Sequence, residues 1–291
     1  MTIMQPPGFH VGAFRIRQVP ELEEVFLPLL DAFPRATPEA VGEMLPRLQP
    51  WCVDADGYML IVVQSYVVQT GRHTILIDSC IGCGKTNHRF PQWHKRTDTA
   101  WLDRLAAAGI APEAVTHVLC THLHSDHSGW NTRLLDGRWV PSFPNAAYIF
   151  ARDEVAHAER GEPEIYAENV LPVIQSGQAV LVDTDHQIED GIWLEPTPGH
   201  TPGHVAVHLE SEGQHAVMWG DLLHSPAQCI RPDWAYRRDT SAEDSTRSRQ
   251  KVLTACAEHR RLVMPAHFPL PSTGYVEPDG AAWTFTYADR G

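Results

Sequence analysis

The sequence predicts an α/β (α+β) fold, a four-layer αββα sandwich, from three observations. Strand-like and helix-like segments alternate along the chain in two successive halves. No linker separates these halves, and no repeat or low-complexity tract interrupts them. Hydrophobic residues make up 43% of the 291 residues, which is enough to build a sizeable core. We therefore expect residues 51–291 to form a single domain, and residues 1–50 to form an N-terminal extension that packs on this domain or on a dimer partner.

The elements follow from local patterns. Residues 1–50 are rich in proline and include one amphipathic piece, Glu21–Leu27. Beyond them, short apolar runs rich in β-branched residues predict strands, and a helical spacing of apolar residues predicts helices. We expect strands near residues 58–69, 72–78, 114–120, 146–150, 179–183, 188–195, 204–210, 214–220 and 262–265. We expect helices near residues 98–108, 152–160, 163–175 and 241–259, the last of which has Ser241 as its N-cap.

A dense group of metal-capable side chains follows the strand expected at 114–120. Residues 121–129 read THLHSDHSG, so four such side chains fall within six positions: His122, His124, Asp126 and His127. Imidazole and carboxylate groups suit zinc and its neighbours. Because side chains two positions apart in an extended chain share a face, His122 and His124 can address one ion. Asp126 and His127 lie where the chain turns, and they can address a second ion nearby.

Three further ligand-type residues lie on turns at the ends of apolar runs. These are His200, Asp221 and His267. Binding and catalytic groups tend to lie on such loops, where a rigid scaffold holds them. His200 is part of a Thr-Pro-Gly-His segment that is repeated at His204, so His204 is an alternative to His200.

The order and wide spacing of these elements resemble the metallo-β-lactamase-fold hydrolases. The resemblance spans about residues 55–270 and also includes Asp78, at the end of the strand expected at 72–78. It implies the metallo-β-lactamase form of the αββα sandwich, with a catalytic domain over residues 51–291. It also implies two divalent metal ions. We expect zinc, with manganese, iron and cobalt as alternatives that accept similar nitrogen and oxygen ligands.

The resemblance assigns a role to each ligand. It implies that His122, His124 and His200 hold the first metal ion, and that Asp126, His127 and His267 hold the second. Asp221 would bridge the two ions together with a hydroxide that attacks the substrate. Asp126 would also relay a proton to the leaving group. Asp78 would orient a ligand histidine or its loop, with a plain strand-end cap as the alternative.

Two positions narrow the reaction. True metallo-β-lactamases usually have Cys or Ser where this chain has Asp221, so β-lactam hydrolysis is disfavoured. The surrounding sequence resembles the branch of quorum-signal lactonases and methyl parathion hydrolase. Those lactonases often place Tyr three residues after the bridging Asp, where this chain has His224. We therefore expect a hydrolase that cleaves a lactone or carboxylic ester, with organophosphate triester activity as an addition.

Other readings stay open at this stage. A thioester hydrolase, an iron-dependent persulfide dioxygenase-like oxidoreductase and a non-catalytic metal-binding sensor are the alternative functions. His224 is a catalytic candidate that either contacts the substrate or leaving group or supports the site. Trp130 and Phe268 flank ligands, and they either line an apolar pocket or belong to the core.

Two short motifs in residues 79–86 carry less weight. The segment ends in Gly-Lys-Thr and resembles a phosphate-binding loop, but Ser79 replaces the first glycine that such a loop requires. Cys80 and Cys83 form a lone C-x-x-C pair without nearby ligand partners, and we interpret them as ordinary loop thiols.

Composition bounds the partners and the compartment. The formal net charge of −13 disfavours a nucleic-acid partner, and we expect a small-molecule substrate. We also expect a homodimer. Met59–Val68 is too short and too polar to span a membrane. Residues 1–12 lack a basic segment followed by an apolar core, so no signal peptide is expected. The six cysteines show no disulfide spacing, which favours a cytoplasmic location.

Overall fold

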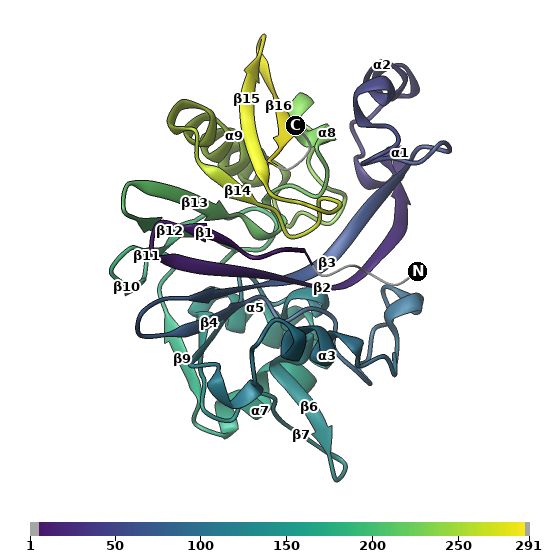
Figure 1. Ribbon diagram of the computed structural model, residues 1–291. Helices are drawn as coiled ribbons and strands as arrows, with labels where there is room; N and C mark the ends of the chain where they lie inside the picture. The colour runs from purple at the N-terminus through teal and green to yellow at the C-terminus, as the bar shows by residue number, and fades with distance from the viewer. Residues whose placement is uncertain (1–5, 289–291) are drawn as a thin grey trace. The chain divides into compact units, whose positions relative to one another are not determined.

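The computed structural model describes residues 6–288 (Figure 1). It contains two seven-stranded sheets, a two-stranded sheet and several helices, which confirms the predicted α/β class. The described residues divide into two compact units. Unit 1 comprises residues 6–21 and 63–186, and unit 2 comprises residues 22–62 and 187–288. Strands β2 and β3 each contribute residues to both units.

The sheet that holds most of the strands of unit 1 has the order β1-β2-β3-β4-β5-β8-β9. Strands β4, β5, β8 and β9 pair in parallel, so their carboxyl ends share one edge. The strands are β1 (Phe9–Val11), β2 (Phe14–Pro28), β3 (Tyr58–Gln69), β4 (Thr74–Ile77), β5 (His117–Leu119), β8 (Ala147–Ala151) and β9 (Ala179–Val182). The hairpin of β6 (Thr132–Leu135) and β7 (Arg138–Pro141) forms the small sheet.

The helices of unit 1 are short. They are η1 (Pro91–Trp93), α3 (Ala100–Ala107), η2 (Pro112–Ala114), α4 (Ser125–Ser128), η3 (Gly129–Asn131), α5 (Arg152–Gly161), α6 (Pro163–Ile165), the π-helix η4 (Tyr166–Val170) and α7 (Leu171–Gln175). The segment 163–175 is helical throughout, as expected, but it consists of three consecutive pieces instead of one regular α-helix. Pro172 lacks an N–H group and cannot continue a regular ladder of helical hydrogen bonds.

The second seven-stranded sheet lies within unit 2 and has the order β10 to β16. Its strands are β10 (Gln187–Glu189), β11 (Ile192–Pro196), β12 (Val205–Ser211), β13 (Gln214–Met218), β14 (Leu262–Met264), β15 (Gly274–Asp279) and β16 (Ala282–Tyr287). The helices are α1 (Leu29–Ala32), α2 (Pro38–Leu48), η5 (Gly220–Leu222), α8 (Ala227–Ile230) and α9 (Ala242–His259). Apolar residues of α9, including Val252, Leu253 and Cys256, pack in a core with Val217 and Val263 of the sheet.

Most expected strands lie within a few residues of their expected positions, and β3 agrees at both ends. The single strand expected over 188–195 is wrong, because Asp190 and Gly191 form a tight turn between β10 and β11. Gly191 has a φ of 81°, which glycine adopts readily. The helix at 241–259 begins as expected, since the Ser241 side chain accepts a hydrogen bond from the backbone N–H of Asp244.

The amphipathic piece Glu21–Leu27 lies in β2, a strand of 15 residues. The boundary expected at residue 50 between an extension and a catalytic domain stays a prediction. Residues 1–5 and 289–291 lie outside the described part, and this includes the first residues of the segment inspected for a signal peptide. Within residues 6–288, every helix is too short or too polar to cross a membrane.

Candidate metal centre

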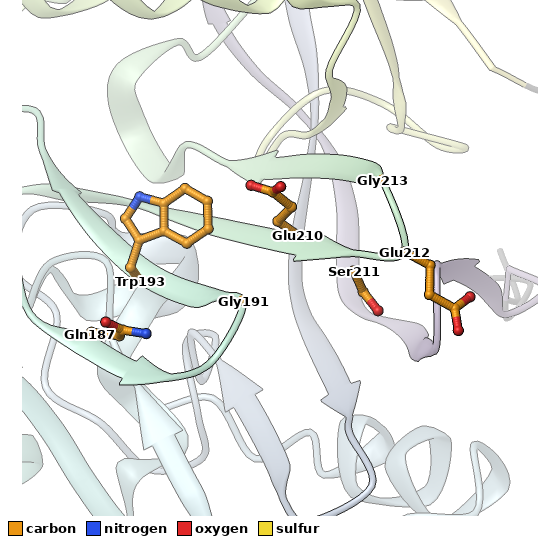
Figure 2. A pocket seen from close by; sticks show the side chains of 7 residues that line it. All are labelled: Gln187, Gly191, Trp193, Glu210, Ser211, Glu212 and Gly213. Atoms are coloured by element: carbon orange, nitrogen blue, oxygen red, sulfur yellow. The ribbon is translucent and has the colours of Figure 1, made fainter.

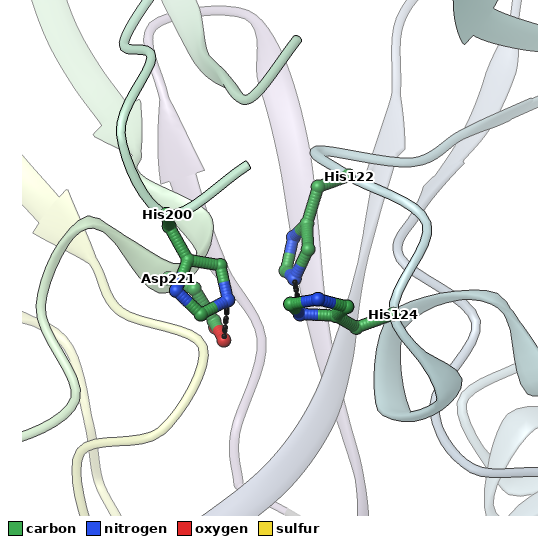
Figure 3. A group of neighbouring side chains, drawn as sticks. All are labelled: His122, His124, His200 and Asp221. Carbon is green, nitrogen blue, oxygen red and sulfur yellow. Dashed lines mark hydrogen bonds and ion pairs between the residues drawn. The ribbon is translucent and has the colours of Figure 1, made fainter. Parts of the chain in front are cut away.

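The histidine–aspartate loop, residues 122–127, lies in unit 1 just beyond β5 and ends in the short helix α4. His122 and His127 are buried, and His124 and Asp126 are half-buried. His122 Nε2 lies 3.0 Å from His124 Nδ1, and Asp126 Oδ2 lies 3.7 Å from His127 Nε2. The structure therefore brings together the members of each pair that the sequence analysis expects to share an ion. Figure 3 shows the contact between His122 and His124.

The second ring nitrogen of His122 and of His127 is held in place. His127 Nδ1 lies 2.8 Å from Asp78 Oδ2, and His122 Nδ1 lies 3.2 Å from Thr121 Oγ1. Asp78 also accepts a hydrogen bond from the backbone N–H of Thr121, at 2.7 Å. Asp78 thus contacts both ends of the turn that carries the ligands, which supports the orienting role expected for it rather than a plain cap.

A second group of ligand-type residues lies in unit 2, and we call it the Asp221 cluster: Asp221, His200, His224 and His267. All four side chains are buried. His200 Nε2 and His224 Nε2 each lie 3.1 Å from Asp221 Oδ2, and His267 Nε2 lies 2.8 Å from Asp221 Oδ1. Figure 3 shows the contact of His200 with Asp221. Three imidazoles therefore converge on one buried carboxylate.

Strand ends position these residues. His200 lies on the turn between β11 and β12, Asp221 follows β13 in η5, and His267 follows β14. Because β13 and β14 pair in parallel, their carboxyl ends meet at one edge of the sheet. The side chains that follow them, Asp221 and His267, are thus delivered to the same place by strands that are distant in sequence.

Further contacts fix the imidazoles of the Asp221 cluster. His200 Nδ1 lies 2.9 Å from Asp239 Oδ1, and His267 Nδ1 lies 2.9 Å from the carbonyl oxygen of Val62. His204, the alternative to His200, accepts a hydrogen bond from the backbone N–H of Asp221 at 3.0 Å. The sequence analysis missed Asp239, because a lone Asp in the irregular segment before α9 carries no local signal.

Two histidines of the Asp221 cluster, His200 and His224, have pKa values shifted in opposite directions. Burial lowers the pKa of His200, but the Asp221 and Asp239 carboxylates outweigh burial and raise the pKa to about 9. Burial lowers the pKa of His224, against the opposing effect of Asp221. The two carboxylates therefore favour a positive charge beside them, and His224 favours its neutral form.

This donor set fits divalent metal ions. Ligand histidines usually turn one nitrogen to the metal and hold the other by a hydrogen bond to a carboxylate or a carbonyl oxygen. His127, His200 and His267 have this arrangement on Asp78, Asp239 and the carbonyl of Val62. Two imidazole nitrogens 3.0 Å apart, as in His122 and His124, also require a proton or a cation between them.

The other residues singled out from the sequence have structural contacts. Trp130 is 2% exposed and stacks on Trp101, and Phe268 is fully buried against Trp219 and Phe285. These contacts favour the core alternative for both. Lys85 Nζ donates to Thr132 Oγ1 and to the carbonyl of Glu168 instead of lining an open phosphate loop. The six cysteines, including Cys80 and Cys83, form no disulfide within residues 6–288.

Unit 2 contains a pocket that is lined by residues other than the expected ligands (Figure 2). It is formed by the hairpin of β10 and β11 and the turn between β12 and β13, and its lining residues are Gln187, Gly191, Trp193, Glu210, Ser211, Glu212 and Gly213. None of the expected site residues lines it.

Comparison with known proteins gives three kinds of similarity. The model of the Metallo-beta-lactamase superfamily matches residues 60–259. An N-acyl homoserine lactonase from Bacillus sp is 32% identical over 187 residues, which cover 61% of this chain and 64% of the lactonase. The chain thus spans less than two thirds of that relative.

Two solved structures resemble nearly the whole chain. The dizinc quorum-quenching lactonase AidC, in complex with a product, has a TM-score of 0.81 at 22% identity and covers 98% of each chain. The hydrolase AbOPH has a TM-score of 0.83 at 23% identity and covers 100% of each chain. At these identities the likeness shows a shared fold, in agreement with the fold expected from the sequence.

Proposed function

The chain belongs to the metallo-beta-lactamase superfamily, and we therefore propose that it is a hydrolase that uses two divalent metal ions to cleave an ester-type bond. One observation carries this proposal: in the Asp221 cluster, three buried imidazoles converge on one carboxylate, within 2.8–3.1 Å. Burial of a polar side chain costs free energy unless the side chain is paired. An apolar core gains nothing from such a group, so its presence supports a metal-binding role.

We assign the ligands as follows. His122, His124 and His200 would hold one metal ion, Asp126, His127 and His267 would hold the other, and Asp221 would serve as a ligand to both. The close pairs within each unit support this assignment. When bound, the ions supply Lewis-acid activation of water and of the substrate oxygen. Zinc is the proposed metal, because the ligands are imidazoles and carboxylates.

The chain's own residues supply the proton transfers. Asp126 is half-buried, which leaves its carboxylate accessible, and we assign it the relay of a proton to the leaving group. His224 is assigned a contact with the substrate or the leaving group. Its Nδ1 is buried without a hydrogen-bond partner among residues 6–288, and its ring stacks on Tyr236 at 3.9 Å between centroids. His224→Ala should change kcat or substrate preference and keep the metal content, whereas loss of metal would make His224 a structural support.

A lactone or a carboxylic ester is the proposed substrate, with organophosphate triesters as further substrates. The lactonase from Bacillus sp supports the lactone assignment. The test is a hydrolysis screen over lactones, carboxylic esters, thioesters and phosphotriesters, with metal content measured on the same sample. A thioester preference would favour the alternative thioesterase, and iron with oxygen consumption would favour the persulfide dioxygenase-like alternative.

The central experiment is Asp221→Ala, with Glu210→Ala as its control. Glu210 is an exposed carboxylate on β12. We expect about two metal equivalents in the wild-type chain, and a loss of turnover of at least about a hundredfold in Asp221→Ala. Glu210→Ala should retain wild-type turnover and metal. Wild-type turnover in Asp221→Ala, or no metal in the wild-type chain, would reject the proposal.

We also propose a cytoplasmic homodimer that binds no nucleic acid. Four large apolar side chains are exposed in unit 2 within residues 25–58, namely Val25, Leu30, Trp51 and Tyr58, and these support a subunit contact. Six cysteines without a disulfide support a reducing compartment. Light scattering on the wild-type chain and on Trp51→Glu tests the dimer, since a wild-type monomer would refute it.

A further inference from the structure

The segment from Asp78 to Gly82 leaves β4 in an unusual backbone conformation. Asp78 has a φ of 55° and Cys80 a φ of 51°, although neither is a glycine. The left-handed region is unfavourable for a residue with a Cβ atom, so the contacts around the segment must hold it there.

Backbone hydrogen bonds join this segment to the last residue of the histidine–aspartate loop and to the residues just beyond it. The Ser79 N–H donates to the carbonyl of His127 at 2.7 Å, and the Gly129 N–H donates to the carbonyl of Cys80 at 2.7 Å. The Trp130 N–H donates to the carbonyl of Ser79 at 2.8 Å. Movement of the segment would therefore displace the backbone of His127.

Glu21, in β2, binds both the Asp78–Gly82 segment and Trp130. Its side chain is 3% exposed and accepts three hydrogen bonds, all from N–H groups. Oε2 accepts from the backbone of Ile81 at 2.7 Å, and Oε1 accepts from Gly82 at 3.2 Å and from Trp130 Nε1 at 2.8 Å. Burial raises the pKa of Glu21 to about 7, and the N–H donors act against burial. A buried carboxylate with this set of partners can serve them only as an acceptor.

We propose that Glu21 is a positioning residue for the metal ion assigned to His127, because its carboxylate clamps the Asp78–Gly82 segment to Trp130. The inference rests on the proposed function for the presence of that ion. Glutamine is the informative replacement. It keeps the shape of the side chain but turns an NH₂ group toward N–H donors, so at least one hydrogen bond is replaced by a repulsive contact.

The experiment compares Glu21→Gln with Glu23→Gln. Glu23 is an exposed carboxylate two residues further along β2, so the control removes the same charge from the same strand. Stepwise zinc affinities are measured by competition with a chromophoric chelator. We expect Glu21→Gln to weaken one of the two zinc ions about tenfold to a hundredfold, the usual effect of losing an outer partner of a ligand. Glu23→Gln should bind both ions as the wild type does.

A double variant identifies the affected ion. His127→Ala already lacks the ligand in question, so adding Glu21→Gln to it should leave the affinity of the remaining ion unchanged. A general loss of folding would instead weaken both ions in the parent chain and also the remaining ion in His127→Ala. Equal affinities in Glu21→Gln and the wild type, or equal weakening of both ions, would overturn the inference.

A measurement on the metal-free chain separates this inference from the proposed function. Hydrogen exchange at the amides of Ile81 and Gly82 should be faster in Glu21→Gln than in the wild type, and unchanged in Glu23→Gln. Trp130→Phe removes the indole donor and part of a buried ring but keeps the Glu21 carboxylate. It serves as the second variant if Glu21→Gln does not fold, and it should accelerate the same amides. Absence of zinc from the wild type would refute the proposed function, and unchanged exchange would refute the clamp.

Discussion

At the scale of single residues, Asp239 shows how much support one ligand receives. Its carboxylate is fully buried and lies 2.9 Å from His200 Nδ1. It also accepts hydrogen bonds from the backbone N–H of Tyr236 at 2.9 Å and from Ser245 Oγ at 2.5 Å. Arg249, which is itself fully buried, lies 3.6 Å away and donates to the carbonyl of Leu222, next to Asp221. Asp239 and Arg249 therefore connect the supports of His200 and Asp221.

Replacement of Asp239 by Asn should weaken metal binding and turnover about tenfold to a hundredfold. The Asn amide keeps the shape of the side chain, but its NH₂ group must face either His200 or the donors Tyr236 and Ser245. Asp233→Asn is the matched control, since Asp233 is partly exposed and pairs with Arg231. Metal titration and kcat/KM on both variants check this prediction. Wild-type values in Asp239→Asn would show that His200 needs no such partner.

At the scale of elements, close backbone approach fixes the turn that follows the histidine–aspartate loop. A Cβ atom added to Gly129 would lie 1.8 Å from the carbonyl oxygen of Ile81. Real Cβ atoms do not approach backbone atoms so closely, and backbone cannot rotate away as a flexible side chain can. Glycine is therefore required at this position by the packing of two loops, one beyond β4 and one beyond α4.

Gly129→Ala should lower the free energy of unfolding by about 2 kcal/mol or more, as overpacking of a tight site does. Because His127 lies two residues earlier, we expect the metal ion assigned to it to be lost first. Gly161→Ala is the control: Gly161 ends α5 with open space around it, and alanine there should be neutral or slightly stabilising. Urea unfolding and metal analysis of both variants provide the measurement, and equal stability of the two would contradict the explanation.

The sequence predicts the elements and site residues whose signals are local, and it misses those that depend on distant contacts. The strands and the histidine–aspartate loop are local signals, in which a β-branched run precedes a cluster of ligands. The order of His200, Asp221 and His267 along the chain, each on a turn after an apolar run, predicted the second group of ligands. Asp239 and Glu21 escaped prediction, because each acts on partners that are distant in sequence, such as Ile81 and Trp130 for Glu21. The turn at Asp190 and Gly191 was missed even though Asp-Gly between two strand-like runs is a local signal for a hairpin.

At the scale of the whole molecule, the proposed ligands are far apart in the sequence. They are His122, His124, Asp126, His127, His200, Asp221 and His267. The formal net charge of −13 opposes compaction of the chain, and bound divalent cations would offset part of it. Metal binding should therefore contribute to the stability of the molecule as well as to its chemistry.

Removal of metal should lower the melting temperature. A ligand present at one hundred times its Kd stabilises the folded state by about 2.7 kcal/mol, which corresponds to a shift of roughly 4–5 °C for a chain of this size. Calorimetry before and after chelation, and again after zinc is restored, measures the shift. Asp221→Ala should show a much smaller shift. A melting temperature that chelation leaves unchanged in the wild type would contradict the prediction.

The division of each unit into two stretches of sequence has a consequence for synthesis on the ribosome. Residues 22–62 are made early, but the rest of unit 2 follows only after residue 186. At about 5–20 residues per second, the intervening stretch takes roughly ten seconds to translate. Unit 1 is complete by then, whereas Leu29, Phe33 and Val41, buried in the finished protein, still lack the residues beyond 186. The nascent chain therefore exposes apolar surface that chaperones would recognise until the residues beyond 186 emerge.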